Sequence, residues 1–229
     1  MFSRILVSLL SLNLFLPIYS EEIEEIVVTA LKRSSTVADT PASITAISST
    51  EIEDKGITDM HDLKHMVPSM NFTNVLGAQN ITIRGIGQFN GNPGVSVSTD
   101  GVFQSRAHSS QLGEMDLERV EVLRGPQGTL YGRNSIGGVV NLITKNPSQD
   151  RDGYIKLGYG NYNTTKAETA FGGGISDSTS FRLVLSTTDQ GEGYYDCLNA
   201  GCGEQGYTDK QAYRLKINSD ISDNVSANL

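Results

Sequence analysis

The sequence predicts a small α+β domain followed by a run of antiparallel strands, and three observations lead to this prediction. Short strand-forming and helix-capping segments alternate along the chain as far as Pro147. A glycine-rich loop joins two β-prone segments just before that proline. After Asp150 the pattern changes to longer segments in which apolar and polar residues alternate, as they do in strands that have two different faces.

The first 20 residues have the features of an export signal. Arg4 supplies the positive start, residues 5–16 form an apolar run, Pro17 ends it, and Ser20 is a small residue suited to cleavage. A membrane anchor is the alternative, but the apolar run is shorter than the roughly 20 residues that a spanning helix needs. We therefore expect a secretory signal at residues 1–20.

Charge and composition exclude several functional classes. The chain has 18 Lys and Arg residues against 26 Asp and Glu residues, which argues against a nucleic-acid partner because such a protein needs a basic face. No later segment is long and apolar enough for a membrane helix. If the chain belongs in a membrane, it must therefore cross it as a β-barrel.

The chain has two cysteines, Cys197 and Cys202. In an exported protein this spacing favours a local disulfide that closes a loop. A zinc pair is less favoured, because no further His or Cys lies nearby. His61 and His65 also lack a third ligand, so two exposed polar residues are favoured over a metal pair, and we predict no metal site and no cofactor.

A β-prone segment lies close to the expected mature N-terminus. Residues 26–29 have high β propensity, and acidic and polar residues surround them. Chain ends are usually loose, so we expect residues 25–30 to be mobile and unpaired. Such a segment is either a short strand or one that adds to the sheet edge of a partner.

Two short helices are predicted between the first strands. Residues 43–48 are β-prone, and Thr50 and Glu53 have the spacing of a capping box, with Thr50 as N-cap. Thr58 is expected to cap a second helix that ends before Pro68. Further strands are predicted at residues 80–84, 95–99, 120–123 and 139–144, with a hairpin turn at Asp100 and Gly101.

The segments after Asp150 alternate strictly. Residues 154–159, 181–187 and 212–218 each place apolar side chains on one face and polar side chains, including Arg182, Arg214 and Lys216, on the other. Strands of roughly ten residues with this pattern are typical of a transmembrane barrel with a polar interior. A soluble sandwich has the same alternation, so the pattern alone leaves both open.

Several short motifs together resemble the plug domain of TonB-dependent outer-membrane receptors. They are Ile83-Arg84-Gly85, Thr99-Asp100-Gly101-Val102, Leu117-Glu118-Arg119-Val120-Glu121, Leu123-Arg124-Gly125-Pro126, Leu130-Tyr131-Gly132 and Gly137-Gly138. The resemblance implies an α+β plug domain, a small mixed sheet with short helices, followed by the first antiparallel strands of an incomplete transmembrane β-barrel. It implies a signal peptide at 1–20, a TonB box and tether at 21–35, the plug at 36–149 and barrel strands at 150–229.

The resemblance also implies functional residues. Glu25, Ile26, Val27, Val28, Thr29 and Ala30 look like a TonB box, the segment by which these receptors are pulled from the periplasm. Arg84 and Arg124 would pair with carboxylates of the barrel wall, since a buried guanidinium needs a partner. The loops after Arg84 and Asp100 would face outwards, which makes Gln88, Phe89, Asn90, Phe103, Gln104, Arg106 and His108 ligand-binding candidates; mere packing explains such residues equally well.

The function implied by the resemblance is energy-coupled uptake of a scarce ligand, most often a ferric siderophore, across the outer membrane of a Gram-negative bacterium. The implied partners are TonB with its inner-membrane energising complex, the ligand and outer-membrane lipid. If the plug lies on the periplasmic side, the first barrel strand runs outwards. Counting strands from there, we expect residues 176–179 to form a periplasmic turn and the long segment 188–209 to form an outer loop.

The number of strands is too small for a closed barrel. The residues after Asp150 hold four or five strands, whereas the smallest barrel needs about 8. We therefore expect the N-terminal part of a longer receptor, and the alternative is a truncated remnant or a plug-like binding module that does not transport. An enzyme is not expected, because the glycine-rich loop lacks the Lys-Ser/Thr ending of a phosphate-binding loop.

Overall fold

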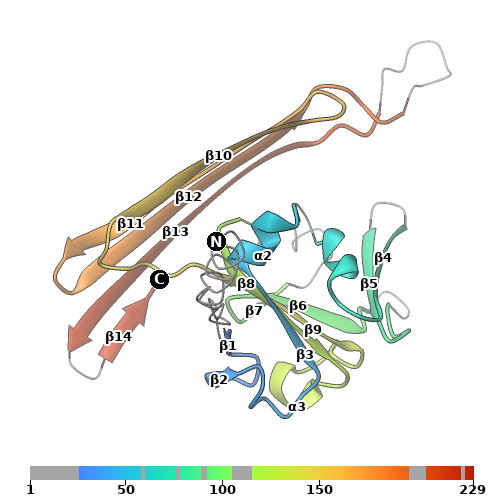
Figure 1. Ribbon diagram of the computed structural model, residues 1–229, viewed down its shortest axis with the longest axis horizontal. Helices are drawn as coiled ribbons and strands as arrows, with labels where there is room; N and C mark the ends of the chain where they lie inside the picture. Colours follow the sequence, from blue (N-terminus) through green and yellow to red (C-terminus); the bar gives the residue numbers. More distant parts are fainter. Residues whose placement is uncertain are drawn as a thin grey trace, which may run out of the picture.

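The computed structural model describes residues 26–57, 60–75, 78–88, 92–104, 115–195, 205–222 and 225–229. The expected export signal, Glu25 and the two cysteines lie outside these residues. Within them, no helix combines the length and the apolar character that crossing a membrane requires. Two bodies make up the described chain, an α+β domain at residues 26–147 and a sheet of long strands, which we call the strand sheet (Figure 1).

A five-stranded mixed sheet organises the α+β domain, in the order β3-β8-β9-β6-β7. Strands β8 and β9 are antiparallel neighbours at its centre, whereas β6 runs parallel to β9. The bounds are Ile44–Ser48 for β3, Leu117–Arg124 for β8, Gly138–Thr144 for β9, Val95–Thr99 for β6 and Val102–Phe103 for β7. The sheet confirms the predicted α+β class and pairs strands that are distant in the sequence.

The two faces of this sheet differ in chemistry. On one face, cross-strand neighbours such as Val97, Val140 and Val122 form an apolar row. The helix α2 (Ser49–Asp54) and the 3-10 helix η2 (Asp62–His65) cover this face. Burying each such aliphatic side chain contributes about 1.5–3 kcal/mol, so this face is the main core. The opposite face carries Ser98, Asn141 and Glu121 side by side, and all three are buried.

The predicted capping box of α2 is wrong in position by two residues. Ser48 is the N-cap: its Oγ accepts from the Glu51 backbone N–H at 3.2 Å, and the Glu51 carboxylate accepts from the Ser48 N–H at 3.2 Å. Both pairs of residues have the required spacing, but Ser48 ends β3 with extended backbone, which an N-cap needs. Glu53 is therefore free to reach the strand sheet instead.

The second predicted helix is shorter than expected. In one strand pair, only the second strand was predicted from the sequence. Only the single turn η2 forms, with Leu63 buried and with His61 and His65 exposed, while Thr58 lies outside the described residues. Strand β4 (Met70–Val75) pairs with β5 (Ala78–Ile83) as an antiparallel hairpin. Polar residues alternate with the buried Met70 and Phe72 in β4, a strand pattern that the sequence prediction missed.

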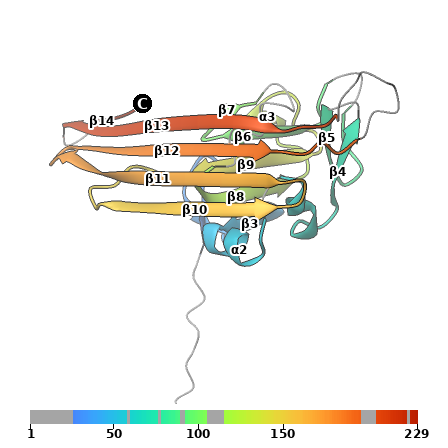
Figure 2. The same ribbon diagram turned by 90° about the horizontal axis from the view of Figure 1, so that it is seen from above.

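The strand sheet contains five antiparallel strands in sequence order, as Figure 2 shows for the four long ones. They are β10 (Asp152–Gly160), β11 (Thr164–Ser176), β12 (Thr179–Gln190), β13 (Asp209–Ser222) and β14 (Val225–Asn228). The sheet does not close: β10 and β14 each lack a second neighbour among the described residues. An open sheet of this order is what the first strands of an incomplete barrel would form.

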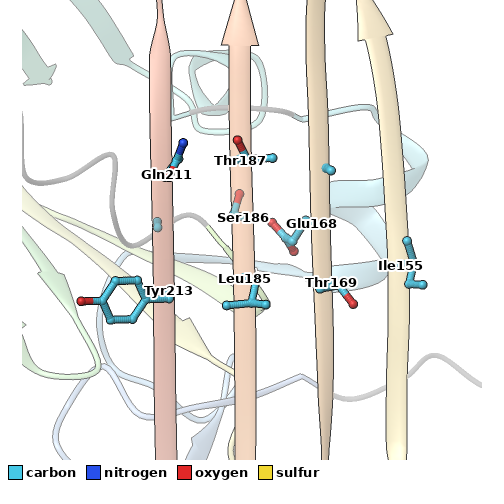
Figure 3. Close-up of a pocket in the computed structure, with 10 residues that line it drawn as sticks. Ile155, Glu168, Thr169, Leu185, Ser186, Thr187, Gln211 and Tyr213 are labelled. Atoms are coloured by element: carbon cyan, nitrogen blue, oxygen red, sulfur yellow. The ribbon is translucent and has the colours of Figure 1, made fainter.

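The outer face of the strand sheet is apolar. Ile155, Thr169, Leu185 and Tyr213 are cross-strand neighbours, and their side chains line a shallow surface hollow (Figure 3). Ile155 and Tyr213 are 75% and 82% exposed, which in water is an unfavourable place for such side chains. The opposite face packs on the α+β domain, where Met115 meets Ala170 and Val184. The predicted alternation is confirmed.

We predict that the α+β domain folds without the strand sheet, and that the strand sheet does not fold by itself in water. A chain that ends at Pro147 should be monomeric, whereas the 229-residue chain should associate in water through its apolar outer face and open edges. Size-exclusion chromatography of both chains measures this. Replacing Leu157 and Tyr213 by Lys should reduce the association. A monodisperse full chain with protected amides in β10–β13 would contradict the prediction and favour a soluble sandwich.

Candidate functional site

The N-terminal segment (residues 26–31) is paired, which corrects the expectation of an unpaired strand, while its mobility stays a prediction. Strand β1 (Val27–Val28) forms an antiparallel pair with β2 (Ser35–Thr36). Val28 and Ala30 are fully buried, while Val27 is 51% exposed. The physical reason is that the segment finds partners on the α+β domain, which local β propensity could not reveal.

The segment contacts the polar face of the central sheet. The Thr29 backbone N–H donates to Glu121 Oε1 at 2.8 Å, and Arg119 Nε donates to the same oxygen at 2.8 Å. Asn141 Nδ2 donates to the other oxygen, Oε2, at 3.3 Å. A buried carboxylate is costly unless donors surround it, and here the N-terminal segment provides one of those donors.

Tyr131 provides a second contact with the segment. It lies on the short helix α3 (Gly128–Tyr131), and its hydroxyl donates to the Ala30 carbonyl at 2.8 Å. The ammonium of Lys32 lies 4.7 Å from the centre of its ring. Burial, assisted by the negative charge of Glu121, raises the pKa of Tyr131 to about 12.

A buried ion pair joins the α+β domain to the strand sheet. Arg182 on β12 donates two parallel hydrogen bonds to Asp116, with Nε–Oδ2 at 2.6 Å and Nη2–Oδ1 at 2.7 Å. Its third nitrogen, Nη1, contacts Asp152 at 2.7 Å. Both Arg182 and Asp116 are almost completely buried, whereas the Asp152 side chain is half exposed. This bidentate geometry makes the contact strong and directional.

Further cations of the strand sheet hold the same domain. Lys216 on β13 lies 2.9 Å from Asp100 Oδ2 and donates to the Thr144 carbonyl at 3.3 Å. Arg214 donates to the Met115 carbonyl. Lys156 on β10 pairs with Glu53 at 2.5 Å, and this hydrogen bond and charge lower the pKa of Glu53. The cations come from the strands and the carboxylates from the α+β domain.

This polarity is the reverse of the pairing expected from sequence, in which arginines of the α+β domain meet carboxylates of the wall. Arg84 is exposed, and its Nη2 donates to Ser43 Oγ at 3.3 Å. Arg124 Nε is buried without a hydrogen-bond partner. Among the described residues neither forms an ion pair. Their pairing with wall carboxylates stays a prediction.

The three described ligand-binding candidates, Gln88, Phe103 and Gln104, lie near the two ends of β6. Gln88 follows Gly87, whose backbone packs against Gly94 just before β6, and its own N–H donates to Asn80. Phe103 pairs with Ser98 near the other end of β6, and Gln104 donates to the Val97 carbonyl. Phe89, Asn90, Arg106 and His108 lie outside the described residues, as does the predicted Cys197–Cys202 disulfide. No group of three or more possible metal ligands occurs in the described residues.

Sequence reasoning placed Arg182, Arg214 and Lys216 on a polar face but missed their partners Asp116 and Asp100. It also missed Glu121 as a contact of the N-terminal segment. The sequence carries a turn signal for Asp100 alone, because Gly101 follows it. In the structure both Asp116 and Asp100 adopt positive φ, at 52° and 49°, where Asp is tolerated in tight turns. No local signal identifies Glu121. It alternates with Val120 and Val122, and this pattern is typical of a strand whose polar side chains face solvent.

Comparisons with known proteins agree on one family. A model of the TonB-dependent receptor plug domain matches residues 36–139. The pesticin receptor of Yersinia pestis is 33% identical over 183 residues, covering 78% of this chain and 27% of that receptor. The ferrioxamine B receptor of Salmonella typhimurium is 32% identical over 165 residues, covering 69% of this chain and 23% of that receptor.

Solved structures agree as well. The crystal structure of the ferric yersiniabactin uptake receptor FyuA from Yersinia pestis matches with a TM-score of 0.70 at 29% identity, over 80% of this chain and 29% of FyuA. The chain thus spans about a quarter of the length of the relatives that it matches.

We predict that Asp116 contributes more to the contact between the two bodies than Asp152 does. Asp116→Asn should lower the free energy of unfolding by about 3 kcal/mol, because it weakens the pairing of a charge that remains buried. Asp152→Asn, at the half-exposed partner of the same arginine, should cost about 1 kcal/mol or less. Denaturant unfolding in detergent measures both variants, and equal losses would contradict the prediction.

We also predict a distinct titration of Tyr131. Its raised pKa favours the neutral phenol in the folded protein, so its contribution to stability is complete below about pH 10 and is lost as the pH rises through about 12. The difference in tyrosinate absorbance between the protein and Tyr131→Phe isolates this single group. A difference that titrates near pH 10, as for an exposed tyrosine, would show that Tyr131 is not buried beside Glu121.

Proposed function

Because the chain belongs to the TonB-dependent receptors, we propose that it is the plug-bearing part of a receptor for energy-coupled uptake of a ferric siderophore across the outer membrane. In this proposal residues 1–20 direct export, 21–35 contain the TonB box and its tether, 36–149 form the plug, and 150–229 begin the barrel wall. The cell is a Gram-negative bacterium, and the plug and TonB box face its periplasm.

The observation that supports this function best is how the plug is held. The strand sheet presents apolar side chains on one face and Arg182, Arg214 and Lys216 on the other, where the plug packs. An apolar outer face suits lipid, and a polar inner face suits a water-filled interior. A plug held through ion pairs and hydrogen bonds can be displaced into water more readily than one held by a large apolar core, because water replaces polar contacts.

TonB is the proposed partner of residues 25–30. Among the described residues β1 pairs with β2 alone, so its other edge has no neighbouring strand, and the Val27 side chain is half exposed. The inner-membrane energising complex then acts through TonB. The N-terminal segment must leave the plug for this to happen, because Val28 and Ala30 are buried in the structure.

The ligand class comes from the relatives. One is named a ferrioxamine B receptor and another a ferric yersiniabactin uptake receptor. We infer a ferric siderophore for this chain, with Gln88, Phe103 and Gln104 as the described candidates for contact. Arg84 and Arg124 would pair with carboxylates on wall strands beyond the five described here, which would also satisfy the buried Arg124 Nε.

The experiment is iron-dependent growth of a receptor-deficient Gram-negative strain that expresses the full-length gene product. Growth on a supplied ferric siderophore should require TonB. Val27→Pro should abolish this growth and leave binding of the labelled siderophore to whole cells unchanged, because proline removes a backbone donor from the strand that TonB would extend.

Val27→Thr is the matched control, since threonine keeps both the backbone N–H and a high β propensity. It should grow like the unaltered receptor. If Val27→Pro transports normally, residues 25–30 are not the TonB box. If growth never depends on TonB, the proposed function itself is wrong.

A further inference from the structure

We propose that the carboxylate of Glu121 is the latch that holds the N-terminal segment on the plug, so that the segment becomes available to its partner when Thr29 leaves this carboxylate. The identity of that partner rests on the proposed function. The latch itself is a property of the described residues.

Glu121 lies where a carboxylate needs hydrogen-bond donors from the protein, because water does not reach it. It lies on the central strand β8 and has no solvent exposure. Its donors come from three separate places: Arg119 two residues away on the same strand, Asn141 on β9, and the Thr29 backbone N–H on the N-terminal segment. Thr29 is the only one of these three that lies on the chain's N-terminal tether, and therefore the only one that pulling can remove.

The plug orients this acceptor in advance. Asn141 Oδ1 accepts from Ser98 Oγ at 2.8 Å, which turns its amide nitrogen towards Glu121. Arg119 Nε fixes the other carboxylate oxygen, and Arg119 Nη2 also donates to Thr29 Oγ1 at 3.1 Å. The Glu121 carboxylate is therefore already oriented towards Thr29 before the segment binds. Thr29 is then held at both its backbone N–H and its hydroxyl.

The other contacts of the segment are apolar or neutral, and among them the fully buried Val28 side chain contributes about 1.5–3 kcal/mol in addition to the contact with Glu121. The β1–β2 pair is a local hairpin of two residues on each side, so both strands can leave together. Ala30 packs on Leu123 and Val139 with a single methyl group. The Tyr131 hydroxyl contributes a neutral hydrogen bond, of about 0.5–1.5 kcal/mol, whereas one to a charged acceptor contributes about 1.5–3 kcal/mol.

Release does not leave an isolated charge behind. When Thr29 departs, Arg119 and Asn141 still surround Glu121. Arg119 is also paired with Glu118, so the cluster stays connected to the plug. The latch can therefore open and close without the large penalty of an unpaired buried charge.

Labelling of a buried cysteine tests the latch directly. Val28→Cys is placed in a 229-residue chain that carries Cys197→Ser and Cys202→Ser, and its rate of reaction with a maleimide is measured in detergent. Val28 is fully buried, so the rate reports how often the segment leaves. Glu121→Gln should raise this rate roughly ten- to hundred-fold, because it removes a charge-assisted hydrogen bond.

The chain offers a matched control at Glu118. This residue is the other carboxylate partner of Arg119, its side chain is 43% exposed, and it does not contact Thr29. Glu118→Gln should leave the labelling rate unchanged. Glu121→Asp keeps the charge beside Arg119 but shortens its reach, so it should raise the rate as Glu121→Gln does. Thr29→Pro removes the donor, and adding Glu121→Gln to it should have little further effect.

Val122→Cys reports the integrity of the fold, since Val122 is fully buried on the opposite face of β8. An unchanged Val28 rate in Glu121→Gln and Glu121→Asp overturns the latch. Equal acceleration at Val28 and Val122 also overturns it, because it shows general loosening. These rates are measured without TonB or siderophore, so their outcome is independent of whether the receptor transports.

Discussion

Two carboxylates of the plug, Asp116 and Glu121, have almost no contact with water, and a buried charge is stable only where donors surround it. Asp116 takes its donors from Arg182 of the strand sheet, and Glu121 takes one of its donors from Thr29 of the N-terminal segment. Each carboxylate thus links the plug to another part of the chain. The position of the plug against the wall and the position of the segment against the plug both depend on satisfying these charges.

The same chemistry explains how the plug is positioned against the strand sheet without a large apolar interface. Its own interior is an apolar core under α2 and η2, which keeps the domain folded when its outer contacts change. Its contacts with the strand sheet are mostly ion pairs and hydrogen bonds, with Met115 as an apolar contribution. Polar contacts of this kind define a geometry. The net contribution of a buried pair to stability is modest because the cost of desolvating its two charges offsets their attraction, although removing one partner is costly.

The strand sheet shows the complementary arrangement. Its apolar residues point away from the plug, and Ile155, Leu157 and Tyr213 are more exposed than a protein surrounded by water would favour. Its cations point towards the plug and meet the carboxylates there. One period of two residues along β10 to β13 therefore gives the sheet an apolar face and a polar face that packs on the plug.

The sequence by itself determined the elements whose signals are local: the strands at residues 95–99 and 139–144, the turn at Asp100, and the alternation after Asp150. The motifs from Ile83 to Gly138 also determined the family. Only the tertiary structure decided the N-cap at Ser48, the docking of the N-terminal segment, and the partners of Arg182 and Glu121. Local patterns record propensity and periodicity, whereas an ion pair between residues 66 positions apart depends on which strands the fold brings together.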